Sequence, residues 1–425
     1  MHLTVDFWID RTEQADELLA GPQDIARIVR DAFSSDPNMI DLAGYPDTLP
    51  GADVASLIRA ISKPYSQELF YRDGGTVEVS DYDRYTANLN LDGLPDSIDV
   101  RFGLVLRRAD MRTWPTRDVV FKTQETFDLD RFQENGLFPA DVVAILAESA
   151  DDQWYFVQSY NYAAWVPQEK IVIGDRQQIL EYRDTENFLI VAGGKVTTNF
   201  NPKVDAISEL QLDMGVRLPL LDAEHIEHNI DGQNTRSSHP VLLPTRSKLG
   251  ELEFRTALIA RNQDVRVGYM PYTRRNILHQ SFKFLGERYG WGHAYNARDC
   301  SGLVMEVYKT FGILLPRNSA QQRNSPVGNN AHFGSNASAE EKLKMLAACD
   351  VGDLLYCPGH VMLYLGNSDG EPYVIHSLYG AGWIEDDGTF QEGALNGVSV
   401  TPLTQIYVSP EETYFDQLNG IKQIR

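Results

Sequence analysis

Three residues in the last third of the chain have the types and spacing expected of a nucleophile with an imidazole base. Cys300 stands in Asp299-Cys300-Ser301-Gly302, directly before a strongly periodic helical stretch. A thiol at a helix start faces unpaired N–H groups and the positive end of the helix dipole, which favour the thiolate. His360 and His376 stand on consecutive strand-like stretches, which can bring two rings together as adjacent antiparallel strands. We predict that Cys300 attacks, that His360 is its base, and that His376 orients His360.

The segments around these residues are expected to position them. Helical patterns run from Thr273 to Gly290, and from Cys300 to Gly312, a glycine suited to a left-handed helix end. Strand patterns then follow at Leu354–Tyr356, Val361–Leu365 and Tyr373–Ile375. Two helices followed by several strands predict an α+β domain with an antiparallel sheet.

The rest of the chain shows two kinds of apolar pattern, one helical and one strand-like. Apolar residues at helical spacing predict helices over 22–33 and 54–61, the second ending before Pro64. From about residue 100, short apolar runs alternate with turn residues, as in small β-barrels or sandwiches. These runs are Leu104–Leu106, Val142–Leu146, Trp154–Val157 and Ala164–Val166.

Composition excludes several classes of protein. The 425 residues contain 38 Lys plus Arg and 60 Asp plus Glu, a formal net charge of −22, which repels phosphate backbones and argues against a nucleic-acid partner. No apolar run approaches the roughly 20 residues of a membrane helix, so no transmembrane segment is expected. The first residues lack a secretory signal, although a mature secreted protein would look the same. We therefore leave two compartments open: the periplasm or cell envelope if a signal was removed, and the cytoplasm otherwise.

The remaining cysteines and histidines give weaker signals. Three cysteines exclude a disulfide framework, and we expect Cys349 and Cys357 to be small buried apolar residues. His225 and His228 have helical spacing beside acidic residues, but we expect a solvated surface segment there and no metal site.

The chemistry-bearing blocks resemble the NlpC/p60 family of papain-like cell-wall peptidases. Six ordered blocks carry the resemblance: Tyr289-Gly290-Trp291-Gly292, Asp299-Cys300-Ser301-Gly302-Leu303-Val304, Leu315-Pro316-Arg317-Asn318-Ser319, Gly352-Asp353-Leu354, Gly359-His360-Val361 and Val374-Ile375-His376. The stretch 107–116, with Trp154–Val157 and Trp165-Val166, resembles a bacterial SH3-like barrel, and 176–262 resembles a second one.

The resemblance implies a multidomain α+β chain. We expect a helical N-terminal region over 1–98, SH3-like β-barrels over 99–175 and 176–268, and a papain-like α+β cysteine peptidase domain over 269–425. The expected partners are murein peptides, with no metal or organic cofactor, and we expect a monomer.

The resemblance also implies an activity and a set of binding residues. The activity is hydrolysis of the bond between γ-D-glutamate and a diamino acid such as diaminopimelate, in murein stem peptides with a free N-terminal L-alanine. Asp299 would face the substrate ammonium, and Trp291 would form a wall. Ser301, Asn318 and Ser319 would line the γ-D-glutamyl pocket. Tyr162 would reach into the active site from the first barrel.

Two departures from the family pattern concern the substrate pocket and leave the nucleophile and base untouched. His293 follows Gly292 where relatives often have a second glycine, and Asn318 replaces a frequent aspartate.

Other roles and functions stay open at this point. Asp299, Asn318 and Ser319 are also suited to helix caps, and Tyr162 to a barrel core. The alternative functions are a catalytically inactive peptidoglycan-binding adaptor, and a papain-like amidase or acyltransferase acting on another amide.

Overall fold

The computed structural model describes residues 1–222, 227–334 and 337–425, which fall into two compact units. One unit contains Cys300 and is called the thiol unit here; it comprises Met1–Met39, Tyr269–Tyr289 and Ala297–Arg425. The other, called the barrel unit, comprises Ile40–Gly268 and Gly290–Asn296. This division differs from the expected boundary at residue 98, because the segment Met1–Met39 packs with the C-terminal part of the chain.

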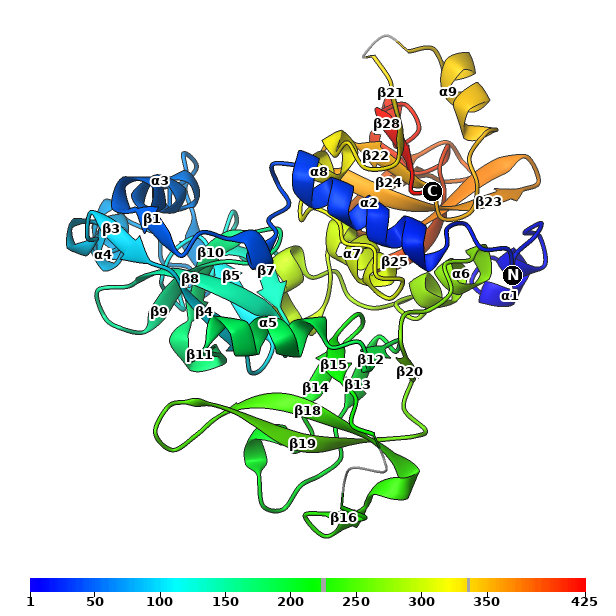
Figure 1. Cartoon of the computed structure of the whole chain (residues 1–425). Helices are drawn as coiled ribbons and strands as arrows, with labels where there is room; N and C mark the ends of the chain where they lie inside the picture. Colours follow the sequence, from blue (N-terminus) through cyan, green and yellow to red (C-terminus); the bar gives the residue numbers. More distant parts are fainter. Residues whose placement is uncertain (223–226, 335–336) are drawn as a thin grey trace. The chain divides into compact units, whose positions relative to one another are not determined.

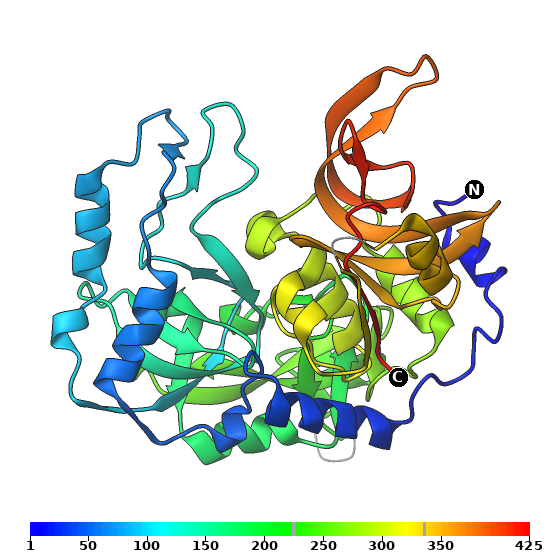
Figure 2. The ribbon, with the colours of Figure 1, turned by 90° about the horizontal axis from the view of Figure 1, so that it is seen from above.

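An antiparallel sheet forms the centre of the thiol unit (Figure 1). Its strand order is β21-β28-β22-β23-β24-β26-β27, and β25 pairs with β24. The bounds are β21 Asn329–His332, β22 Leu354–Cys357, β23 His360–Ser368, β24 Glu371–Ile384, β25 Phe390–Pro402, β26 Tyr407–Ser409, β27 Glu412–Thr413 and β28 Gly420–Gln423. Asp369 and Gly370, both with positive φ, make the tight turn between β23 and β24. The far ends of β24 and β25 curl away from the other strands (Figure 2). The predicted strand runs over 354–356, 361–365 and 373–375 are confirmed.

Helices accompany this sheet. They are α1 Val5–Ile9, α2 Pro22–Ser35, α6 Arg274–Phe282, α7 Cys300–Lys309, α8 Ser319–Asn324 and α9 Ala339–Leu346. The helix α7 begins at Cys300 because Asp299 Oδ1 accepts a hydrogen bond from Gly302 N at 2.8 Å. Its apolar residues are buried, and Gly312 just beyond its end has a φ of +82°, as predicted.

The helix α6 is shorter than predicted. It ends at Phe282, so the expected continuation through Leu285 to Tyr289 is wrong. Lys283 is the C-cap, the next amides make hydrogen bonds three residues back, and Gly286 has a φ of +84°. In this segment Phe284 and Tyr289 are buried, and Leu285 is half-buried.

The N-terminal segment Met1–Met39 runs along the thiol unit. Leu18 forms a β-bridge with Thr273, Leu19 N donates to Tyr272 O at 2.9 Å, and Asp16 pairs with Arg275 at 2.6 Å. Trp8 is fully buried and contacts the ring of Tyr373. The predicted helix over 22–33 is confirmed as α2.

The barrel unit contains an antiparallel sheet in the order β11-β4-β8-β9-β10-β5-β7. The bounds are β4 Arg101–Val105, β5 Ala109–Arg112, β7 Gln133–Leu137, β8 Val142–Glu148, β9 Trp154–Gln158, β10 Ala163–Pro167 and β11 Ile171–Gly174. All four of the predicted apolar runs between residues 104 and 166 lie in or at the end of these strands.

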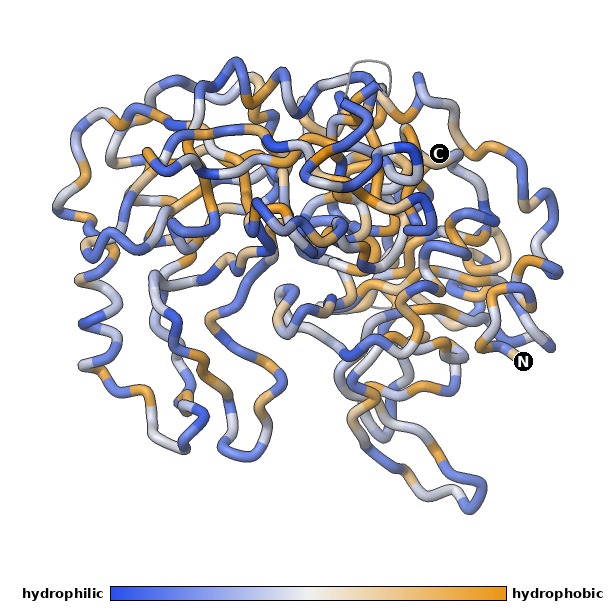
Figure 3. Tube along the Cα trace, turned by 90° about the horizontal axis from the view of Figure 1, so that it is seen from below, coloured by the Kyte–Doolittle hydropathy of each residue, from blue (hydrophilic) through white to orange (hydrophobic). Residues whose placement is uncertain are grey.

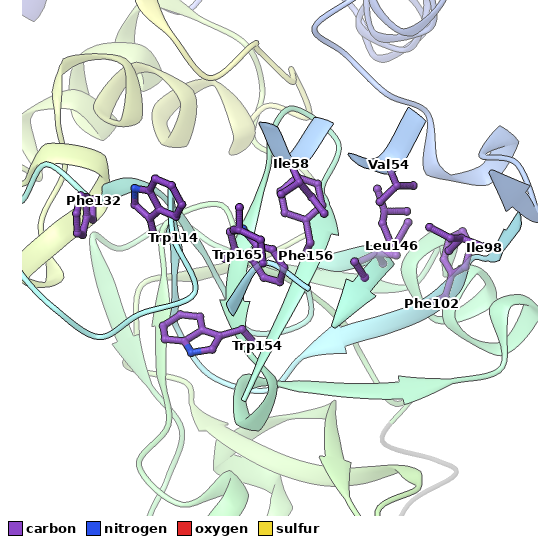
Figure 4. Close-up of a cluster of buried hydrophobic side chains, with 14 of the residues drawn as sticks. Val54, Ile58, Ile98, Phe102, Trp114, Phe132, Leu146, Trp154, Phe156 and Trp165 are labelled. Carbon is purple, nitrogen blue, oxygen red and sulfur yellow. The ribbon is translucent and has the colours of Figure 1, made fainter. Parts of the chain in front are cut away.

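The helix α3 (Gly51–Ile61) covers one face of this sheet and shares its core. Val54 and Ile58 of α3 lie over Leu146, Phe156 and Trp165 of the sheet (Figure 4). The predicted helix over 54–61 is therefore confirmed, although Leu57 of its predicted apolar stripe is 38% exposed. The helices α4 (Val79–Asn88) and α5 (Arg176–Asp184) belong to the same unit. Residues 40–98 thus fold with the sheet that follows them.

Beyond α5, the chain forms several small antiparallel sheets around one apolar core. The strands are β12 Phe188–Val191 with β15 Arg217–Pro219 and β20 Val265–Val267, β13 Lys195–Thr197 with β14 Gln211–Asp213, and β18 Ser238–Arg246 with β19 Leu252–Ala260. A second SH3-like barrel over 176–268 stays a prediction.

The barrel unit also contains three short two-stranded pairs. They are β1 Thr48–Pro50 with β3 Ser97–Asp99, β2 Phe70–Tyr71 with β6 Val120–Phe121, and β16 Asn229–Ile230 with β17 Gln233–Asn234.

Apolar and polar residues alternate over short stretches of the trace (Figure 3). None of the described helices is long and apolar enough to cross a membrane. His225 lies outside the described residues, while His228 is exposed. Within the described ranges, no group of three or more His, Cys, Asp or Glu side chains is arranged to hold a metal ion.

Candidate active site

Cys300 is the first residue of α7, and only 7% of it is exposed. The backbone N–H groups of Val361, on β23, and of Ser301 interact with its sulfur and favour the thiolate. Val361 directly follows His360 on β23, so the base candidate is the chain neighbour of the residue whose backbone N–H interacts with the sulfur. The predicted proximity of Cys300 and His360, far apart in sequence, is in keeping with this placement; Asp299 interacts electrostatically with both.

The two predicted histidines form a pair. His360 Nε2 lies 2.9 Å from His376 Nδ1, and the ring centroids are 5.1 Å apart. The neighbouring strands β23 and β24 bring the rings together, as predicted from the sequence. His360 is 7% exposed and His376 is fully buried.

Thr401, which sequence reasoning missed, extends this chain of hydrogen bonds. Its Oγ1 lies 3.0 Å from His376 Nε2. For His360 Nδ1 to accept a proton, His360 Nε2 must carry the ring proton and donate it to His376 Nδ1. His376 then carries its own proton on Nε2 and donates it to Thr401 Oγ1. With Thr401 Oγ1 as the acceptor, the two tautomers leave His360 basic at Nδ1.

Burial sets the resting charge of the pair. It raises the pKa of Cys300 to about 12, and the Asp299 carboxylate acts in the same direction, against the donors from Val361 and Ser301 and the charge of Arg317. Burial also lowers the pKa of His360 to about 4, with Asp299 opposing the change. The pKa of His376 is lowered by burial and by His360. Both reacting groups are neutral near pH 7. The expected thiolate is thus not the resting form, because desolvation outweighs the helix start.

Asp299 and Arg317 form a buried ion pair next to the nucleophile. Arg317 Nη2 lies 2.6 Å from Asp299 Oδ2, and Arg317 Nη1 donates to Ser301 Oγ at 2.8 Å. Ser301 Oγ in turn donates to Asp299 Oδ1 at 3.2 Å. Asp299 therefore has the capping role that the sequence left open. Arg317 received no role from the sequence, although it lies inside the Leu315-Pro316-Arg317 block that signalled the family.

Asn318 and Ser319 lie at the start of α8. Asn318 is the exposed N-cap, and its backbone N–H donates to Gln321 Oε1 at 3.1 Å in a capping box. Ser319 is buried as the first helical residue. Their positions match the capping alternative, and their substrate contacts stay a prediction.

Trp291 and Tyr162 belong to the barrel unit. Trp291 Nε1 donates to Gln133 O at 3.0 Å, and Arg131 stacks on its indole ring. Tyr162 is half-buried, and its hydroxyl donates to Glu134. Each residue has a defined place within that unit, and their predicted contacts with substrate are untested.

The segment Gly290–Asn296 is held on β7 by its backbone. Gln133 Nε2 donates to Gly292 O at 2.8 Å, and Arg108 donates to His293 O at 2.8 Å. His293 has a φ of +66°, a left-handed conformation in which glycine is favoured. His293 therefore stands where relatives often have a second glycine, at a position whose left-handed conformation glycine adopts without strain.

Family models match two parts of the chain. The NlpC/P60 family matches residues 286–410, and the SH3 domain of SH3b1 type matches residues 120–167. A gamma-D-glutamyl-L-lysine dipeptidyl-peptidase of Bacillus cereus is 26% identical over 227 residues, which cover 51% of this chain and 56% of that relative. The match thus spans little more than half of the relative's length.

A solved structure of similar length has the same fold. An NlpC/P60 endopeptidase from Photobacterium damselae subsp. piscicida aligns with a TM-score of 0.78 at 17% identity, over 99% of this chain and 96% of that chain. An NlpC/P60 family protein from Bacillus cereus aligns at 20% identity over 69% of this chain and 82% of that chain, with a TM-score of 0.46. The chain therefore contains an NlpC/P60 domain over residues 286–410, which includes Cys300, His360 and His376, and an SH3 domain over residues 120–167.

Proposed function

We propose that the chain is a cysteine endopeptidase that hydrolyses the bond between γ-D-glutamate and a diamino acid, such as diaminopimelate, in murein stem peptides. The observation that carries the proposal is the hydrogen-bonded chain from His360 through His376 to Thr401, beside a thiol at the start of α7. This arrangement supplies a nucleophile, a base and an orienting group without a metal or organic cofactor.

Because the Cys300 thiol and the His360 imidazole are both neutral at rest, the proton leaves the thiol during the attack on the substrate. As the Cys300 sulfur attacks the γ-D-glutamyl carbonyl carbon, its proton moves to His360, and a tetrahedral oxyanion forms. The Cys300 backbone N–H, at the helix start, donates to that oxyanion. Collapse breaks the C–N bond, and the amine leaves with the proton from His360, which gives a thioester. Water then attacks the thioester, with His360 again accepting the proton, and the product acid and free thiol are released.

The substrate class rests on family likeness. The Bacillus cereus relative is named for a gamma-D-glutamyl-L-lysine peptide, and it shares 26% of its residues with this chain over the aligned part. We propose a free N-terminal L-alanine as a requirement, with its ammonium near Asp299. Because Arg317 already pairs with that carboxylate, a substrate ammonium would share Asp299 with the guanidinium.

The direct test uses L-Ala-γ-D-Glu-diaminopimelate with the full chain. We expect release of L-Ala-γ-D-Glu, detected by mass spectrometry, and no release with Cys300→Ala. The N-acetylated peptide tests the need for a free amine, and the L-lysine peptide tests the diamino acid. Equal behaviour of wild type and Cys300→Ala would exclude the peptidase. Bound murein without cleavage would then indicate an adaptor, and a trapped acyl-enzyme from another amide would indicate an amidase or acyltransferase.

The proposed murein peptidase activity requires a compartment in which murein peptides are present. We propose the periplasm or cell envelope, with cytoplasmic murein recycling as the alternative. Fractionation of the host cells, followed by detection of the protein in each fraction, distinguishes the two.

A further inference from the structure

Tyr356 carries a buried hydroxyl that has no hydrogen-bond partner among the described residues. It lies on β22, is 1% exposed, and its Oη is inaccessible to solvent. A buried polar group without a partner lowers stability, so such groups are rare and call for a reason. Phenylalanine would fill the same space without this cost.

Three other buried tyrosines of the thiol unit have hydrogen-bond partners. Tyr272 donates to Ile424 O at 2.9 Å, and Tyr308 donates to Gly352 O. Tyr364, also on the central sheet, accepts a hydrogen bond from Asn367 Nδ2 at 2.9 Å. The absence of a partner is therefore specific to Tyr356 within this group.

The position of Tyr356 brings it close to the nucleophile. In the β22–β23 hairpin, Tyr356 stands directly opposite Val361, whose N–H interacts with the Cys300 sulfur. The helix α7, which begins at Cys300, packs on β23. Burial raises the pKa of Tyr356, and the charge of a Cys300 thiolate acts in the same direction. Asp299, Arg317 and Tyr414 also interact electrostatically with Cys300.

We propose that the Tyr356 hydroxyl is kept in the core to stabilise the Cys300 thiolate with its O–H dipole. A neutral thiol is a weak acceptor, which agrees with an unbonded hydroxyl in the resting state. Once the proton moves to His360, the sulfur carries charge, and a nearby hydroxyl is worth more in a dry interior than in water. The inference rests on the proposed role of Cys300 as nucleophile, but not on the identity of the substrate.

The test is the alkylation rate of Cys300 by iodoacetamide between pH 6 and 10 in the full chain. Modification is followed on the Cys300 peptide by mass spectrometry, so that Cys349 and Cys357 do not contribute. We expect Tyr356→Phe to slow alkylation at fixed pH by about three- to tenfold, the effect of one weak to ordinary interaction with a charged group. Its melting temperature should equal or exceed that of wild type, because the substitution removes an unpaired buried hydroxyl.

Tyr364→Phe is the matched control, since it removes a buried hydroxyl from the same sheet that does not act on Cys300. It should leave the alkylation rate unchanged. An unchanged alkylation rate in Tyr356→Phe, or an equally large loss of rate in Tyr364→Phe, overturns the proposal.

If Tyr356→Phe does not fold, 3-fluorotyrosine at position 356 is the second variant, because it keeps the shape of the side chain and makes the hydroxyl a stronger donor. Faster alkylation of Cys300 then supports the proposal, and an unchanged rate overturns it. Peptide hydrolysis is assayed separately, so a failure of the proposed substrate leaves this result interpretable.

Discussion

Thr401 Oγ1 lies 3.0 Å from His376 Nε2, at the end of the ring opposite the nitrogen that faces His360. Thr401 is on β25 and His376 on β24, so the contact joins two neighbouring strands. The hydroxyl is the last member of the chain of hydrogen bonds that runs through both imidazole rings. Its contribution is testable because serine keeps the acceptor and valine keeps the shape.

We expect Thr401→Val to lower kcat about ten- to a hundredfold with little change in KM. Without the acceptor, His376 gains nothing from carrying its proton on Nε2, and the buried pair can adopt the tautomers that leave His360 protonated at Nδ1. Thr401→Ser should retain most of the activity. Steady-state hydrolysis of the tripeptide measures both. Equal losses in the two variants would mean that the packing of the methyl group, and not the hydroxyl, matters at this position.

The pH dependence follows from the two neutral groups. Because the pKa of His360 is lowered to about 4, the base is unprotonated above that pH, and kcat/KM should hold from pH 7 to about pH 5 before it falls. Because the pKa of Cys300 is raised to about 12, its alkylation should rise steadily from pH 6 to 10. A preformed thiolate–imidazolium pair predicts instead a plateau of alkylation at acidic pH. Observing that plateau would contradict the neutral resting state.

The sequence anticipated the parts of the site that local patterns determine. Cys300 at a helix start and the strands that carry His360 and His376 each have a signal in the residues next to them. Thr401 and Tyr356 have none, since a threonine on a strand and a tyrosine in a core are ordinary until their neighbours are known. The resting charge also depends on burial, which the neighbouring elements create and the helix start alone does not reveal.

The division into two compact units differs from the expected boundary at residue 98 for a related reason. The helices α2 and α3 were predicted from apolar spacing, but spacing does not say which core a helix joins. The contact of Leu18 with Thr273 places the segment Met1–Met39 with the thiol unit, while Val54 and Ile58 of α3 pack into the barrel unit. Both contacts are non-local, so the apolar spacing within each helix does not reveal them.

Removal of Arg317 should destabilise the thiol unit. Arg317 and Asp299 have 2% and 9% of their side chains exposed, so Arg317→Gln leaves a buried carboxylate without its counter-ion. Breaking such a pair costs about 3–5 kcal/mol. Arg317→Lys keeps the charge but loses the two-pronged contact with Asp299 and Ser301, and should cost less. Denaturant unfolding, followed by a signal from the thiol unit, measures the difference.

The double variant Asp299→Asn/Arg317→Gln provides the matched comparison. It removes both charges, so we expect its loss of stability to be smaller than the sum of the two single losses. Additive losses would show that the two side chains do not stabilise each other. The cycle reports on stability alone, since Asp299 also acts on Cys300 and activity would mix both effects.

The contact between Gly136 and His293 makes a compensation experiment possible within the barrel unit. A Cβ on Gly136 would lie 2.8 Å from His293 Cβ, closer than two such atoms approach in folded proteins. We expect Gly136→Ala to lower stability by about 1–3 kcal/mol, the usual cost of overpacking. Gly44→Ala is the control, because its nearest neighbour, Asp41 Oδ2, is 3.9 Å away.

His293→Gly should rescue Gly136→Ala. The substitution removes the clashing Cβ and also relieves the left-handed backbone at φ +66°, while it loses the edge-to-face contact with Phe138 at 5.4 Å. The double variant should therefore be more stable than Gly136→Ala alone, as measured by thermal unfolding. If the double variant is less stable than Gly136→Ala, the packing of His293 on Phe138 outweighs the clash, and the segment Gly290–Asn296 depends on its imidazole and not on close backbone approach to β7.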